Sequence, residues 1–143
     1  MTNKKGFTLV ELLGVIVVIA ILGGLAAVSI NYIVQNSKKS VYKNYESALK
    51  TAAENYLIEN TDQLPPEPGD GVEYTKSDKI TYGVLTSGLF MDKIKDPNGG
   101  NCDFSYVIVK RGKDIGFNYN LTYEYCLICD NYITNSDDYV CEK

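Results

Sequence analysis

The residues of this sequence best suited to chemistry are four cysteines in its C-terminal third: Cys102, Cys126, Cys129 and Cys141. Cys126 and Cys129 form a Cys-x-x-Cys motif, which occurs in zinc sites and in thiol redox sites. An even number of cysteines confined to one region favours structural disulfides in an exported domain. A four-cysteine zinc site ranks second, because the other two cysteines are widely separated. A redox site ranks third, because such a motif usually opens a helix, whereas Leu127-Ile128 looks like the core of a strand.

The rest of the chain lacks the usual catalytic residues. It contains no histidine, which excludes Ser-His-Asp triads and every metal motif that needs an imidazole. Neither a phosphate-binding loop nor a G-x-S-x-G sequence occurs. Two polar segments carry oxygen ligands but do not follow the EF-hand pattern, so we interpret them as solvated loops: the Asp96–Asp103 turn, and Asp130 with Asn135, Asp137 and Asp138. The sequence therefore predicts a protein that is not an enzyme, with no catalytic residue, bound metal or cofactor apart from the zinc alternative.

A single carboxylate, Glu11, stands at the start of an apolar stretch that continues from Leu12 to Ile30. As a helix, the segment from Phe7 to Ile30 spans about 36 Å, and the hydrocarbon core of a bilayer is about 30 Å thick. A charge in such a segment costs free energy, so it usually serves a purpose and is tolerated when it is paired. Lys4 and Lys5 precede this stretch, and Gly6-Phe7 forms the junction.

The run Lys4-Lys5-Gly6-Phe7-Thr8-Leu9-Val10-Glu11, followed by a long apolar helix, resembles the N-terminus of type IV prepilins and pseudopilins. The resemblance implies that a membrane peptidase cuts between Gly6 and Phe7 and that Phe7 is then N-methylated. It also implies that Glu11 meets the positive N-terminus of a neighbouring subunit during assembly. A secretory signal peptide would have a shorter apolar stretch, and a plain membrane anchor would explain neither Glu11 nor the Gly6-Phe7 junction.

The same resemblance implies an organisation and a set of partners. We expect a cytoplasmic leader (1–6), a transmembrane or filament-core helix (7–35) and a pilin-like globular domain (36–143). The implied partners are other pilin or pseudopilin subunits, the prepilin peptidase and methyltransferase, an assembly ATPase with its membrane platform, and membrane lipid. A net charge of −4 lacks the basic footprint of a nucleic-acid binder, so no specific nucleic acid is expected.

Charge alone does not fix the orientation in the membrane. Lys4 and Lys5 favour a cytoplasmic N-terminus, whereas Lys38, Lys39 and Lys43 oppose it under the positive-inside rule. The cleavage motif and the cysteines decide for an N-terminus inside and a globular domain outside. The expected location is the inner or cytoplasmic membrane first, and then an extracellular or periplasmic filament.

Because no proline occurs before Pro65, residues Phe7 to about Glu59 can form one helix, apolar in its first half and amphipathic in its second. Its apolar stripe is expected at Val41, Tyr45, Ala48, Ala52 and Tyr56, widened by Leu49 and Ala53. Many pilins have a helix-breaking proline in the apolar half. This chain has Gly23-Gly24 there instead, which leaves open whether the helix melts on assembly.

Short elements are expected after the helix. They are a loop at 60–70, a strand at 72–74, a short helix or turn within 85–94, a turn at 96–100, strands at 104–110, 115–119 and 122–127 with a hairpin turn at 111–114, a polar loop at 131–138, and an edge strand at 139–141. Together they predict an α+β fold in which the long N-terminal helix packs on a small antiparallel sheet. The resemblance further implies that Cys141 pairs with Cys126 or Cys129, and that Cys102 takes the remaining partner.

These observations favour a structural subunit that polymerises through its N-terminal helix, in a type IV pilus-like or a type II secretion or competence-like filament. The alternative is a membrane-tethered extracellular binding module, possibly zinc-stabilised, that does not polymerise. Glu11 distinguishes the two, because only polymerisation needs a carboxylate at that position.

Overall fold

The computed structural model describes residues 6, 8–116 and 118–142, without the side chains of 25–29. The chain divides into two compact units, residues 1–39 and residues 40–143, and we call the second unit the head. Helix α1 (Leu9–Glu59) contributes to both units, which confirms the long N-terminal helix. Phe7, where we expected this helix to begin, lies outside the described residues.

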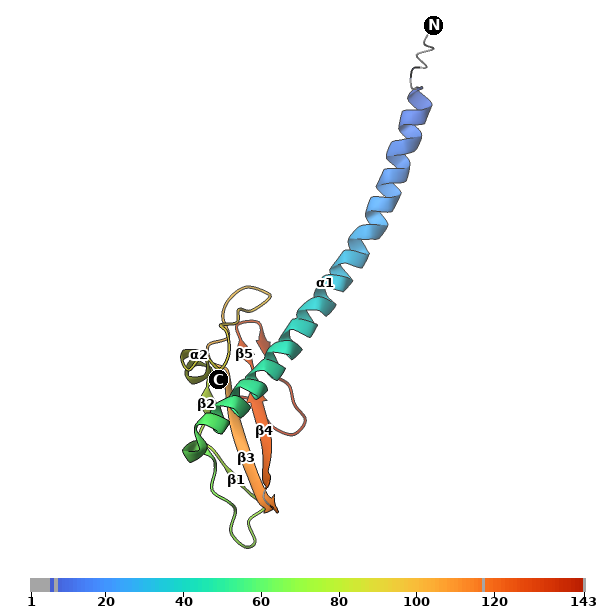
Figure 1. The fold of residues 1–143 in the computed structure, drawn as a ribbon. Helices are drawn as coiled ribbons and strands as arrows, with labels where there is room; N and C mark the ends of the chain where they lie inside the picture. The colour runs from blue at the N-terminus through green and yellow to red at the C-terminus, as the bar shows by residue number, and fades with distance from the viewer. Residues whose placement is uncertain (1–5, 7, 117, 143) are drawn as a thin grey trace. The chain divides into compact units, whose positions relative to one another are not determined.

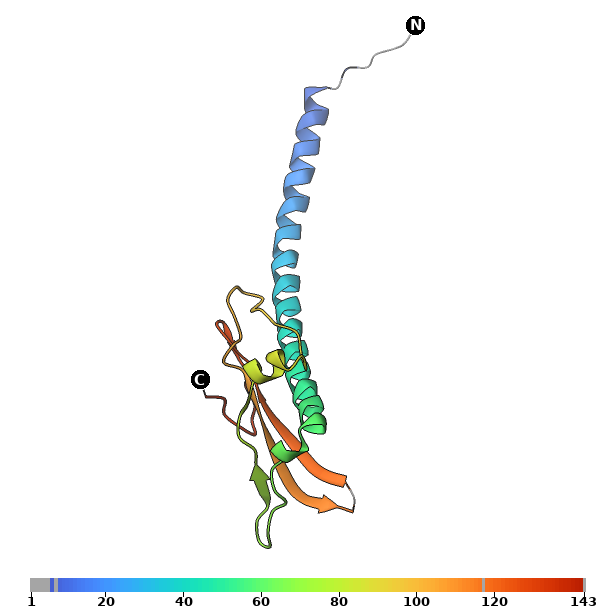
Figure 2. The same ribbon diagram turned by 60° about the vertical axis from the view of Figure 1, so that its left-hand side comes forward.

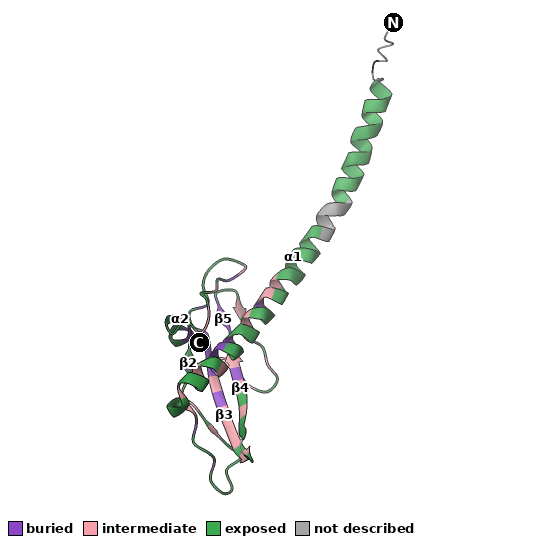
Figure 3. Ribbon diagram, in the orientation of Figure 1, coloured by how far each residue is buried: buried purple, intermediate pink, exposed green. Residues whose placement is uncertain are grey.

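In the first unit, α1 presents apolar side chains to solvent. Every side chain from Leu9 to Gly24 is exposed, as the green ribbon of Figure 3 shows. Apolar surface of this extent normally marks a site of association with a protein or a membrane. Within the described part of the chain, however, no helix is both long enough and apolar enough to cross a bilayer. Membrane insertion of residues 7–35 therefore stays a prediction.

In the head, the C-terminal part of α1 packs on one face of a small sheet (Figures 1 and 2). The helix residues that are buried in this core are Tyr42, Leu49, Ala52, Ala53 and Leu57. The prediction of the apolar stripe was therefore slightly wrong: Ala48 is exposed, whereas Tyr42 and Leu57, which the prediction left out, are buried. In a helix with 3.6 residues per turn, residues three and four positions apart lie on the same face. Leu49 and Ala53 therefore mark the face of α1 that is buried.

The sheet consists of β1 (Tyr74–Lys76), β2 (Ile80–Thr81), β3 (Tyr106–Ile115) and β4 (Asn118–Cys126). β1 and β2 both pair antiparallel with one side of β3, and β4 pairs antiparallel with the other side. Val107 and Val109 on β3 alternate into the core beneath α1. This arrangement confirms the predicted α+β architecture. β5 (Ile128–Cys129) and β6 (Tyr132–Ile133) form a separate small hairpin, and η1 (Thr61–Gln63) follows α1.

The hairpin turn expected at 111–114 is wrong, because β3 continues through it to Ile115. The chain reverses instead at Gly116, whose φ of 66° suits a residue without a Cβ. Gly112 pairs with Asn120 and Ile115 with Asn118, so β3 carries one extra residue between these pairs. Residues typical of turns thus form a β-bulge. The guanidinium of Arg111 bridges the bulge by donating to Asp114 Oδ2 at 2.5 Å.

Other boundaries also differ from expectation. The first strand begins at Tyr74 rather than at residue 72. Helix α2 (Tyr82–Ser87) starts earlier than the expected 85–94, because the Thr81 hydroxyl accepts a hydrogen bond from the Val84 amide and caps it. Residues 139–141, where we expected an edge strand, form no strand. The disulfide from Cys141 to Cys126 and the hydrogen bond from the Tyr139 hydroxyl to the Tyr125 carbonyl hold this segment in place of the hydrogen bonds of a sheet.

Candidate functional site

The N-terminal motif is organised by two side chains, Thr8 and Glu11. The Thr8 hydroxyl accepts a hydrogen bond from the Glu11 amide at 3.3 Å, and Glu11 Oε2 accepts one from the Thr8 amide at 3.2 Å. The Thr8 hydroxyl also donates to Glu11 Oε2 at 3.2 Å. This reciprocal arrangement is a capping box, and it satisfies two amides that the first helical turn leaves without partners. The first helical hydrogen bond, from the Leu12 amide to the Thr8 carbonyl, follows directly.

The role of Thr8 was missed from the sequence, although the Thr-x-x-Glu spacing is its signal. In the structure Glu11 is exposed and sits in the first turn of α1, where the helix dipole favours a negative charge. A cation from another molecule can therefore reach the carboxylate. Gly6 is also exposed, and a Cβ there would meet nothing within 4 Å, so local packing does not require a glycine.

The four cysteines form two disulfides, Cys102–Cys129 and Cys126–Cys141. The two members of the Cys-x-x-Cys motif thus bond to different partners. Cys126 ends β4 and holds the C-terminal segment, while Cys129 in β5 bonds to the loop before β3. A disulfide sulfur is not a thiolate that can bind zinc, and a thiol redox site would bond the two cysteines of the motif to each other. Neither of these sites is therefore assembled here.

Asp96 is a buried carboxylate whose hydrogen bonds join α1 to two loops. Its Oδ1 accepts from the Tyr42 hydroxyl at 2.5 Å and from the Asn98 amide at 2.7 Å, and its Oδ2 accepts from the Asn131 amide at 2.7 Å. Burial opposes ionisation of this carboxyl, but the hydrogen bonds from Tyr42, Asn98 and Asn131 outweigh it and lower the pKa of Asp96. Our interpretation of Asp96 as a solvated loop carboxylate is therefore wrong. The other polar segment, with Asp130, Asn135, Asp137 and Asp138, is exposed.

A second polar contact fixes the β5–β6 hairpin on the helix. The rings of Tyr42 and Tyr132 stack with centroids 4.0 Å apart. The Tyr132 hydroxyl and the Thr134 hydroxyl both donate to Glu46 Oε1, at 2.8 and 2.7 Å. Burial and the hydrogen bond to Glu46 raise the pKa of Tyr132. Together with the Asp96 contacts, these hydrogen bonds hold the disulfide-linked loops in one position on α1.

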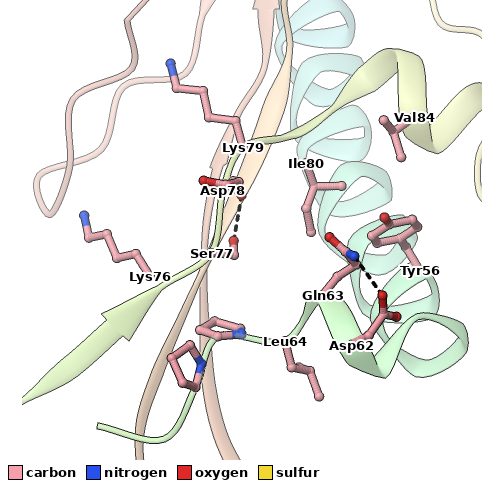
Figure 4. A pocket seen from close by; sticks show the side chains of 12 residues that line it. Tyr56, Asp62, Gln63, Leu64, Lys76, Ser77, Asp78, Lys79, Ile80 and Val84 are labelled. Atoms are coloured by element: carbon pink, nitrogen blue, oxygen red, sulfur yellow. Dashed lines mark hydrogen bonds between the residues drawn. The ribbon is translucent and has the colours of Figure 1, made fainter. Parts of the chain in front are cut away.

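A surface depression of about 400 Å³ lies between η1 and the β1–β2 segment (Figure 4). Its polar groups bond within the chain: Gln63 donates to Asp62 Oδ2 at 2.9 Å, and the Ser77 hydroxyl donates to the Asp78 carbonyl at 2.8 Å. Its lysines, Lys76 and Lys79, are exposed. Lys76 pairs with Glu124 Oε2 at 3.3 Å, and the ammonium of Lys79 lies 4.1 Å from the centroid of the Tyr106 ring. The depression therefore does not resemble a substrate site.

Comparison with known proteins points to the N-terminus. Residues 1–27 match the family model of the prokaryotic N-terminal methylation motif. The matched segment contains Gly6, Phe7, Thr8 and Glu11, and it confirms the prepilin-type motif that we inferred there. This motif belongs to structural subunits rather than to an enzyme family. Neither a curated protein nor a solved structure matches the chain.

Proposed function

We propose that this chain, which carries the prepilin-type methylation motif, is a pilin or pseudopilin subunit of a type IV pilus-like or a type II secretion or competence-like filament. The observation that carries the proposal is the match at residues 1–27, which includes the start of α1, where every residue from Leu9 to Gly24 is exposed and most of the side chains are apolar. Outside a membrane, a lone subunit would leave this surface in water, and packing against copies of the same helix keeps it out of water.

Processing prepares the N-terminus for that packing. A prepilin peptidase cuts between Gly6 and Phe7, and methylation of the new amine at Phe7 follows. The product places a positive charge one residue before Thr8, beside the capping box. Glu11 then exchanges its bonds with Thr8 for the N-terminal ammonium of a neighbouring subunit, because a carboxylate in a filament core needs a cationic partner.

Location follows from the same segment. Residues 7–35 hold the processed subunit in the inner or cytoplasmic membrane, with the head outside, until the assembly ATPase and membrane platform move it into a filament. The two disulfides support an oxidising environment for the head, since such bonds persist outside the cytosol. Lipid, other subunits and the processing enzyme are therefore the partners of the N-terminal segment.

Mass spectrometry of the mature protein tests this proposal. We expect a chain that starts at Phe7, carries one N-terminal methyl group and has lost four hydrogens to two disulfides. A Gly6→Leu variant should keep residues 1–6, because the peptidase requires a residue without a side chain at that position. A wild-type chain that starts elsewhere, or that starts at Phe7 without a methyl group, contradicts the assignment.

The rival function is a tethered binding module that never polymerises. Its zinc-stabilised form loses support because the cysteine sulfurs are paired with one another. A tethered module would also have no use for a charge-specific role of Glu11. The effect of replacing Glu11 therefore distinguishes the two functions.

A further inference from the structure

Leu89 is an apolar side chain held outward from the head. Its side chain is 91% exposed, and its φ of 62° is a left-handed conformation that a leucine rarely adopts. The neighbouring Phe90 is directed inward, where its ring meets that of Tyr56 edge to face with centroids 5.4 Å apart. The amides of Leu89 and Phe90 donate to the carbonyls of Thr86 and Leu85 and close the C-terminus of α2, a position where a left-handed residue is common. This cap holds the Leu89 side chain in solvent.

An apolar groove of about 480 Å³ lies elsewhere on the head, between the end of α1 and the first half of β4. Its apolar lining consists of Leu57, Ile58, Leu64, Tyr119, Leu121 and Tyr123. Ile58 and Tyr119 are 74% and 56% exposed, so the groove leaves a large part of its own apolar surface in water. We call it the edge groove.

The two features lie on different edges of the sheet. Leu89 follows α2, which continues directly from β2 on one side of β3, whereas the edge groove borders β4 on the other side (Figure 1). A projecting side chain on one edge and a receptive groove on the other suit a heterologous contact, in which each copy uses both surfaces. Such contacts generate open helical assemblies when they do not close into a ring.

The exposed charges around the two surfaces differ in the sign of their sum. The segment that follows Leu89 exposes one carboxylate and two ammonium groups, those of Asp92, Lys93 and Lys95. Glu54 lines the edge groove and pairs with Lys50 at 3.8 Å. Glu59 and Asp62 are exposed beside the groove in sequence, so carboxylates outnumber the one lysine there. Approach of the Leu89 edge to the edge groove therefore brings lysines toward carboxylates, which favours this pairing over contact between like surfaces.

We propose that the occupant of the edge groove is Leu89 of a second copy of this chain. The contact links heads in series, and it rests on the proposed function because a filament supplies the neighbouring copy. It adds to the packing of the N-terminal helices a second contact that involves the heads alone.

The first test is Leu89→Gly, compared with Val140→Gly at another exposed apolar side chain. Glycine adopts a positive φ readily, so thermal unfolding of the detergent-solubilised full chain should occur at the same or a higher temperature. We expect sheared filament protein to fall about tenfold, the order of effect for withdrawing one buried leucine. The Val140→Gly variant should give as much sheared filament protein as the wild type. Unchanged filament yield in Leu89→Gly overturns the proposal.

The second test is chemical crosslinking of assembled filaments. Cells that make a mixture of Leu89→Cys and Ile58→Cys chains, treated with a short bismaleimide, should give crosslinked dimers, and each variant alone should give none. Filaments that form without this crosslink overturn the docking contact and leave the proposed function standing. If the wild-type chain forms no filament at all, the proposed function and this inference fall together.

Discussion

The hydroxyl of Tyr42 donates to Asp96 across 2.5 Å and joins α1 to a turn 54 residues further along the chain. The same tyrosine oxygen accepts a hydrogen bond from Asn98 Nδ2 at 2.8 Å. One helix side chain therefore holds both polar residues of the turn, and its ring supports Tyr132. We expect much of the order of the head to depend on this contact.

Tyr42→Phe tests that dependence. The ring stays, but Asp96 loses a donor and Asn98 loses an acceptor in a buried place, at a cost of about 1–3 kcal/mol in the free energy of unfolding. Chemical denaturation of the full chain in detergent measures the change. Tyr32→Phe is the matched control, because Tyr32 is 71% exposed and should change nothing. Equal stability of the two variants would show that the contact is not important.

The pH dependence of stability follows from the lowered pKa of Asp96. A carboxyl whose pKa is lower in the folded than in the unfolded chain stabilises the fold above the unfolded value, which is about 3.9. That contribution is lost as pH falls through the folded pKa. Thermal unfolding between pH 7 and pH 2 should therefore show an acid-induced loss that is smaller in Asp96→Asn, which starts less stable at pH 7. Parallel curves for the two proteins would contradict this role of Asp96.

The cysteine pairing predicts a specific thiol count. Denatured wild-type protein should react with no thiol reagent before reduction and with four equivalents after it, whereas a zinc site would leave all thiols reactive after chelation. Replacing Cys126 and Cys141 together by serine should cost about 3 kcal/mol by loop-closure entropy, and the longer loop of Cys102–Cys129 slightly more. Reactive thiols in the unreduced chain would contradict the pairing.

The long helix was predictable because no proline interrupts it before Pro65, and the sheet because β3 and β4 are rich in β-branched and aromatic residues. The reversal at Gly116 was not, because Arg111 to Asp114 have the composition of a turn and only the pairing with β4 turns them into a bulge. Asp96 looked solvated for a similar reason. The donors on Tyr42 and Asn131 are distant from Asp96 in sequence and meet it only in the folded head, whereas the Asn98 amide is a local partner.

At the N-terminus, more of the candidate site could be predicted from the local sequence. The motif was recognisable from Lys4 to Glu11, and the Thr8–Glu11 capping box involves residues three positions apart. The edge groove, in contrast, combines the end of α1 with β4, so no local pattern could have indicated it.

The central claim is that Glu11 joins subunits by its charge, and Glu11→Gln tests it most directly. Glutamine at this position still completes a capping box, so α1 keeps its start while the carboxylate is lost. We predict that sheared filament protein falls on the order of 100-fold, because an ammonium left without its partner in a low-dielectric core is costly. Glu73→Gln, a control at an exposed carboxylate of the head outside the edge groove, should assemble normally. If Glu11→Gln cells shed as much filament protein as the wild type, the account of this chain as a charge-registered filament subunit is wrong.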